Sequence, residues 1–196
     1  MHIIIITDIF GLTTDIDLLS ASLSTELTRV TVIDPYDGYK QTFINEQAAY
    51  DTFMTQCGHE RYSSAVSSAI ALSEDEVVLL GFSAGASAAW KAIDQHLNPL
   101  IKHCIGFYPS QIRNHLDVIP CCPVTLVFPC EERHFEVDDV IAALSSVKQV
   151  NCIKTSFYHG FMNSLSDNYS LIGATFFNDK MNDSSKLDSV EIFNRI

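Results

Sequence analysis

Short apolar runs alternate with longer segments of helical periodicity along most of the chain. The apolar runs predict six strands, at residues 2–6, 29–33, 76–80, 101–107, 123–128 and 150–156. The segments between them predict helices at about residues 15–27, 44–56, 60–72, 84–96, 136–147, 167–180 and 186–194. In the first helix, Thr14 resembles the start of a capping box, and Ile16, Leu19, Leu23 and Leu27 fall on one face.

The strand-like runs are continuous stretches of Ile, Val and Leu and do not alternate with polar residues. Such runs are typical of a sheet that is covered on both faces. Strands that alternate with helices favour right-handed parallel crossovers. We therefore predict a three-layer α/β/α sandwich, formed as a single domain by residues 1–196, around a mostly parallel sheet of about six strands. Functional groups of such a sheet lie in the loops that follow the carboxyl ends of its strands.

The chain has 24 acidic and 12 basic residues and a formal charge of -12. Nucleic acids and anionic membranes bind clustered Lys and Arg, so the composition argues against both as partners. No apolar run approaches the length of about 20 residues that a bilayer requires. The six cysteines include no Cys-x-x-Cys pair, and the N-terminal run indicates a strand and not a signal peptide. We expect reduced thiols and a cytoplasmic location.

The segment Gly81-Phe82-Ser83-Ala84-Gly85 follows a predicted strand directly and precedes a helix rich in small residues. This placement is typical of a nucleophile elbow, in which a serine occupies a strained turn and the glycines relieve crowding. The spacing does not match the G-x-G-x-x-G pattern of dinucleotide sites. The chain also lacks a His-x-x-x-His pair, so we expect neither a metal nor an organic cofactor.

A serine nucleophile requires a base and an acid that orients the base. In this fold the base comes last in the chain, and His159 follows the last predicted strand. The acid should follow the strand at residues 123–128, where both Glu131 and Glu132 qualify. For the oxyanion, one backbone donor is the N–H of Ala84, and the second comes from the loop at residues 7–11.

The motifs together resemble the dienelactone hydrolase family of α/β-hydrolases over nearly the whole chain. Beside the elbow, the matching segments are Asp8-Ile9-Phe10-Gly11, Asp34-Pro35-Tyr36, Glu46-Gln47-Ala48, Gly106-Phe107-Tyr108, Phe128 to Phe135 and His159-Gly160-Phe161. The resemblance implies a minimal α/β-hydrolase fold without a cap domain. The first strand here would be the family's third, which predicts a smaller sheet with an exposed edge.

On this resemblance Ser83 takes the nucleophile position, His159 the base position and Glu132 the acid position when residues are counted from Pro123. Ile9 and Ala84 take the positions of the oxyanion donors. A count back from the end of the acid loop instead places Arg133 at the acid position, and an arginine cannot accept the imidazole proton.

Three departures from the family pattern bear on the site and its substrate. The family's namesake enzymes use a cysteine nucleophile, whereas this chain has Ser83. Asn45 and Asn163 stand where those enzymes hold a substrate carboxylate with arginines, and Asp8 stands where they have a glutamate near the nucleophile. Because neutral amides cannot replace a charged bidentate arginine, dienelactone is not the expected substrate.

These inferences predict a serine-dependent carboxylic ester hydrolase that cleaves a small ester, thioester or lactone through an acyl-enzyme. Asp8, Asn45 and Asn163 are candidate contacts to the substrate or to the catalytic residues. A second copy of the chain is a candidate partner. The alternative is a non-catalytic binding protein that retains the α/β-hydrolase fold.

Overall fold

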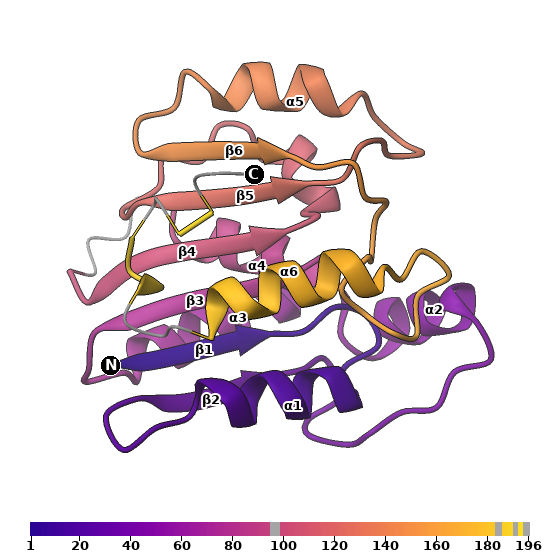
Figure 1. Cartoon of the computed structure of the whole chain (residues 1–196), viewed down its shortest axis with the longest axis horizontal. Helices are drawn as coiled ribbons and strands as arrows, with labels where there is room; N and C mark the ends of the chain where they lie inside the picture. Colours follow the sequence, from indigo (N-terminus) through magenta and orange to yellow (C-terminus); the bar gives the residue numbers. More distant parts are fainter. Residues whose placement is uncertain (95–98, 183–185, 190–191, 194–196) are drawn as a thin grey trace.

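A parallel sheet of six strands organises the computed structural model, which describes residues 1–94, 99–182, 186–189 and 192–193 (Figure 1). The strands are β1 (His2–Ile6), β2 (Arg29–Ile33), β3 (Val77–Phe82), β4 (Ile101–Phe107), β5 (Val124–Phe128) and β6 (Val150–Lys154). Their order is β2-β1-β3-β4-β5-β6, and all neighbours are parallel. The chain adds β2 on one side of β1 and then returns to add β3 on the other side. The point between β1 and β3 is therefore the topological switch point, where open α/β sheets bind their ligands.

Helices cover both faces of the sheet. Figure 1 shows α1 (Thr14–Leu23) and α6 (Leu171–Met181) in front of it. The opposite face carries α2 (Glu46–Gln56), α3 (Gly58–Ala71), α4 (Ala84–Ala92) and α5 (Val137–Leu144). The isoleucines of β1 show why the apolar runs are continuous: Ile3 and Ile5 pack with α1 and α6, whereas Ile4 and Ile6 pack with the helices of the other face. The predicted three-layer sandwich is confirmed, and the described residues form no cap domain.

Helix α1 differs from its prediction at both ends. Its N-cap is Thr13 and not Thr14, and the Thr13 hydroxyl accepts a hydrogen bond from the N–H of Ile16. The helix ends at Leu23, and residues 24–28 form a turn closed by a bridge between Thr25 and Thr28. The prediction for Leu27 was wrong: it lies outside the helix and is 86% exposed.

The last predicted helices are also shorter than expected. Helix α6 begins at Leu171, where the Ser170 side chain caps it, and not near residue 167. In the segment predicted as a helix at residues 186–194, the described residues 186–189 and 192–193 form turns and no α-helix; the rest lies outside the described residues. Helix α4 ends at Ala92, and residues 95–96 of its prediction lie outside the described residues. Within the described ranges, no helix is both long and apolar enough to cross a bilayer.

Candidate active site

A sharp turn joins β3 to α4 and presents Ser83. This residue has a φ of 49° and a ψ of -111°, a left-handed conformation that is strained for a residue with a side chain. The turn needs glycine on both sides. A Cβ on Gly81 would lie 2.6 Å from the Ala86 Cα, and one on Gly85 would lie 2.3 Å from the Thr7 carbonyl oxygen. The strained serine and its two glycines therefore form the elbow that the sequence predicts.

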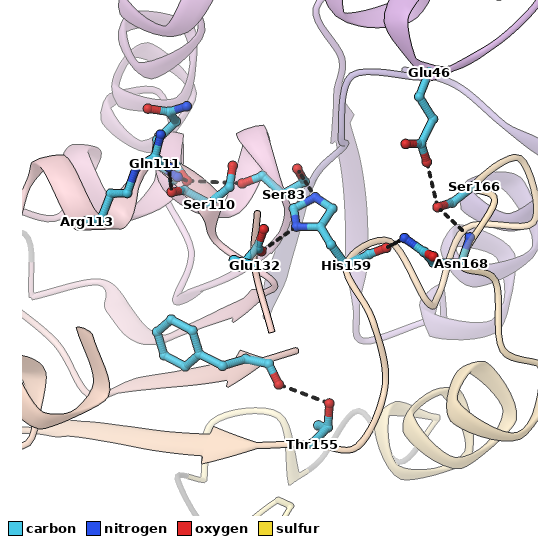
Figure 2. Close-up of polar contacts among 12 residues, drawn as sticks. Glu46, Ser83, Ser110, Gln111, Arg113, Glu132, Thr155, His159, Ser166 and Asn168 are labelled. Carbon is cyan, nitrogen blue, oxygen red and sulfur yellow. Dashed lines mark hydrogen bonds and ion pairs between the residues drawn. The ribbon is translucent and has the colours of Figure 1, made fainter. Parts of the chain in front are cut away.

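Three side chains meet at this turn, and we call Ser83, His159 and Glu132 the candidate triad (Figure 2). The Ser83 Oγ lies 2.9 Å from the Nε2 of His159, and the Nδ1 of His159 lies 2.6 Å from the Oε1 of Glu132. The Glu132 side chain is only 9% exposed, and that of His159 is 31% exposed. The carboxylate of Glu132 therefore meets the imidazole where it is largely shielded from water.

The neighbouring Glu131 is exposed, and no hydrogen bond or ion pair joins it to another described residue. The acid loop takes its orientation from the loop that carries His159. The Cys130 N–H donates to the Phe157 carbonyl oxygen at 2.7 Å. The Thr155 hydroxyl and N–H both donate to the carbonyl oxygen of Phe128, each at 3.0 Å (Figure 2). These bonds tie the ends of β5 and β6 together and place Glu132, and not its neighbour, against the imidazole.

The backbone around His159 is held by a residue that sequence reasoning missed. The Asn168 Nδ2 donates to the His159 carbonyl oxygen at 3.1 Å (Figure 2). The Tyr108 ring lies beside the imidazole, with 5.1 Å between the ring centroids. Nothing in the local sequence around Asn168 signals this contact, because it depends on how the loop before α6 folds back.

The loop after β1 supplies the second predicted backbone donor. The Asp8 Oδ1 accepts from the Phe10 N–H at 2.9 Å, and the Gly11 N–H donates to the Asp8 carbonyl oxygen at 3.1 Å. The Tyr36 hydroxyl donates to the Ile9 carbonyl oxygen at 2.5 Å. These bonds fix the loop, and no hydrogen-bond acceptor among the described residues takes the Ile9 N–H. The N–H of Ala84 is at the first position of α4, where the helix itself offers no acceptor.

Asp8 and Asn163 are buried and bonded to each other. The Asn163 Nδ2 donates to the Asp8 Oδ2 at 2.7 Å, and its Oδ1 accepts from the Leu165 N–H. Burial raises the pKa of Asp8, although the bonds from Asn163 and Phe10 act in the opposite direction. Asn45 is exposed and caps α2 by accepting from the Ala48 N–H. Both asparagines therefore use their side chains within the protein.

No group of His, Cys, Asp and Glu in the described part of the chain has the arrangement of a metal site. The six cysteines, all of them among the described residues, form no disulfide with one another. The arrangement at Ser83 brings together a hydroxyl, an imidazole and a carboxylate, the types of side chain that acyl transfer uses.

Comparison with known proteins identifies the chain's relatives. The sequence profile of the dienelactone hydrolase family matches residues 1–194. An uncharacterised protein of Bacillus subtilis, YczH, is 31% identical over 128 residues, which are 62% of this chain and 60% of the relative. The match thus spans less than two thirds of that relative's length.

Solved structures with the same fold have low sequence identity. A dienelactone hydrolase-like promiscuous phosphotriesterase from metagenomic libraries superposes with a TM-score of 0.68 at 13% identity, covering 95% of this chain and 86% of its own. A candidate dienelactone hydrolase of Klebsiella pneumoniae superposes with a TM-score of 0.66 at 14% identity, covering 92% and 84%. Both support the α/β-hydrolase fold.

Proposed function

Because the chain belongs to the dienelactone hydrolase family, we propose that it is a serine hydrolase that cleaves a small ester, thioester or lactone through an acyl-enzyme at Ser83. Family membership supports hydrolase function in general. The hydrogen-bonded series from Ser83 through His159 to Glu132 carries the finer proposal, because it links a nucleophile, a base and an acid in the order that acyl transfer requires.

Acyl transfer requires one particular placement of the protons on Ser83, His159 and Glu132. A carboxylate at Glu132 can only accept hydrogen bonds, so the Nδ1 of His159 keeps its proton and donates a hydrogen bond to the Oε1 of Glu132. The Nε2 is then free to accept the proton of the Ser83 hydroxyl as its oxygen attacks the acyl carbon. The imidazolium that forms is stabilised by Glu132 and returns the proton to the leaving group.

The negative charge on the substrate oxygen develops next to the elbow. We assign its stabilisation to the N–H groups of Ile9 and Ala84, and loss of one such donor typically costs about 3 kcal/mol in the transition state. Water then attacks the acyl-enzyme with His159 again as the base, and the carboxylic acid leaves. No cofactor takes part in this sequence of steps.

The charges near the candidate triad favour an uncharged substrate. The buried acid Asp8 is close enough to interact electrostatically with His159, and the two asparagines at the arginine positions are occupied by protein contacts. An anionic substrate would therefore meet no cation at the two arginine positions, and an ionised Asp8 would repel it. We propose a neutral small molecule as the substrate. A single domain over residues 1–196, a cytoplasmic location and a homodimer stay predictions.

A fluorophosphonate probe tests the proposal. The wild-type protein should gain the mass of one phosphonyl group, and peptide mapping should place it on Ser83. The Ser83→Ala variant should gain none, whereas Ser110→Ala, which removes a nearby serine hydroxyl, should react like the wild type. A short activated ester should be hydrolysed by the wild type and by Ser110→Ala alone.

An unlabelled wild-type protein that retains its native fold, or a label on a serine other than Ser83, would contradict the proposal. The first result would favour the alternative of a non-catalytic binding protein with this fold.

A further inference from the structure

A pocket of about 170 Å³ lies between α3, α4 and the short helix η1 (Ser110–Asn114). We call it the α3–α4 pocket. Seven of its eight lining residues are of polar types; the lining consists of His59, Glu60, Ser63, Ser87, Ala88, Lys91, Gln111 and His115. It contains no member of the candidate triad, and its volume leaves room for several water molecules or a small polar ligand.

Two polar atoms of the lining residues are buried without a hydrogen-bond partner. They are the Nε2 of His59 and the Oγ of Ser63, and Ser63 as a whole is only 8% exposed. Buried polar atoms in native proteins are nearly always paired, because an unpaired one costs about 1–3 kcal/mol. Two such atoms on consecutive turns of α3, beside one polar pocket, point to an absent ligand that would pair with both.

The pocket lining contains one lysine, Lys91, and one acid, Glu60, in a chain whose formal charge is -12. The Lys91 side chain is only 20% exposed, and its partner Glu60 lies on the outside, 86% exposed. The pKa of His59 is lowered by burial and, next, by the positive charge of Lys91, whereas Glu60 raises it. Glu60 pairs with Lys91 from an exposed position, so an anion inside the pocket would share Lys91 with Glu60 or replace it.

The pocket is held open by bonds between its walls. The Gln111 N–H donates to the Ser87 Oγ at 3.1 Å, and the Trp90 Nε1 donates to the His115 carbonyl oxygen at 2.8 Å. Both bonds fasten η1 to α4. A binding site that exists before the ligand arrives loses little free energy to ordering.

We propose that the α3–α4 pocket binds a compact oxyanion, a phosphate or carboxylate group, through Lys91, the Ser63 hydroxyl and the His59 imidazole. Lys91 supplies the charge, and the hydroxyl and the Nε2–H tautomer of His59 supply directed donors. A metal cation would be repelled by Lys91, and an apolar ligand would leave both buried polar atoms unpaired.

The site is separate from the candidate triad but shares a helix with it. The Ser87 hydroxyl, part of the pocket wall, donates to the Ser83 carbonyl oxygen at 3.2 Å. The proposal does not depend on catalysis, so binding can be measured on a protein whose nucleophile has been removed.

Isothermal titration calorimetry of the full chain with inorganic phosphate, and in parallel with acetate, at constant ionic strength tests the proposal. We expect saturable binding of at least one anion at a single site. Lys91→Gln should weaken it by about tenfold or more, and Ser63→Ala by about three- to tenfold. Stronger binding of phosphate would identify a phosphoryl ligand, and stronger binding of acetate a carboxylate.

Two variants serve as controls. Lys102→Gln removes an equal charge from another Lys–Glu pair, with Glu76, outside the pocket, and Ser83→Ala removes the candidate nucleophile. Both should bind the anion as the wild type does. Ser63→Ala removes a hydroxyl without a partner, so it should fold normally even if Lys91→Gln does not.

Absence of saturable binding to the wild type at tens of millimolar anion would overturn the proposal. Equal losses in Lys102→Gln and Lys91→Gln would show a general charge effect, and loss of binding in Ser83→Ala would place the anion at the candidate triad. Either result would also overturn it.

Discussion

Two polar regions beside α4, one at its start and one farther along it, use their hydrogen bonds differently. In the candidate triad, each of Ser83, His159 and Glu132 is bonded to another member, and the glycines of the elbow leave no space around the turn. In the α3–α4 pocket, Ser63 and His59 have buried atoms without partners beside an open volume. A site that performs chemistry gains from groups fixed before the substrate arrives. A site that binds a ligand must leave donors for it, and their unpaired state lowers the stability of the empty protein.

The largest effect on activity is expected from breaking the hydrogen bond between His159 and Glu132 in the candidate triad. Glu132→Gln should lower kcat on a short activated ester by up to about 10⁴-fold, because an amide no longer fixes the proton on the Nδ1 of His159. Glu131→Gln, the matched control at an exposed position, should stay within about twofold of the wild type. Steady-state kinetics measure both. A larger loss in Glu131→Gln would transfer the acid's role to that residue.

The next effect concerns the packing of the elbow. In Gly85→Ala the new Cβ would lie 2.3 Å from the Thr7 carbonyl oxygen and 2.4 Å from that of Ile6, both backbone atoms, so we expect a loss of about 3 kcal/mol. In Gly106→Ala the nearest atom is the Leu126 Cδ2 at 3.1 Å, which belongs to a side chain that can move, so the loss should be about 1 kcal/mol. Urea unfolding measures both. Equal losses would show that the elbow is not unusually tight.

A smaller effect is expected on the titration of His59. Its pKa in the empty pocket lies below the ordinary value of 6.5, so this residue destabilises the folded state as the pH falls below 6.5. A bound anion favours the imidazolium, so saturating phosphate should raise the pKa of His59 above its value in the protein without anion. The ring resonances in an NMR titration report it. His103, buried and bonded to the Leu187 carbonyl oxygen and to Thr125, should not respond.

If the pKa of His59 is unchanged at saturating phosphate, or if His103 shifts equally, the anion does not lie beside His59. That result would remove the contrast between the two regions.

The smallest effect is expected from Ser63→Ala without any anion. It removes a hydroxyl that has no partner, so the free energy of unfolding should stay unchanged or rise by up to about 1 kcal/mol. Ser67→Ala is the matched control one turn along α3, because the Ser67 hydroxyl donates to the Ser63 carbonyl oxygen. Both substitutions gain the same helix propensity, but only Ser67→Ala loses a hydrogen bond. Ser63→Ala should therefore be the more stable variant in urea unfolding. The reverse order would show that the Ser63 hydroxyl has a partner in solution.

The three layers of the fold and the turn at Ser83 could be predicted because short stretches of sequence are enough to indicate them. The isoleucines of β1 predict a strand buried on both faces, and the glycines around Ser83 predict a turn too tight for side chains. Errors occur where local signals are equivalent: adjacent threonines could each cap α1, and the structure uses Thr13. The periodicity that includes Leu27 continues past the true end of the helix, because the chain must turn to reach β2.

The sequence by itself determined the order of strands and helices, the strained serine turn and the position of His159 after the last strand, because these depend on neighbours in the chain. From the residues alone Glu131 and Glu132 both qualified and the resemblance favoured Glu132, whereas the tertiary structure brings the Glu132 carboxylate to the imidazole. Only it revealed the α3–α4 pocket, whose walls come from three separate elements. Whether a buried polar atom finds a partner is decided by distant segments that pack around it, and no local pattern records that outcome.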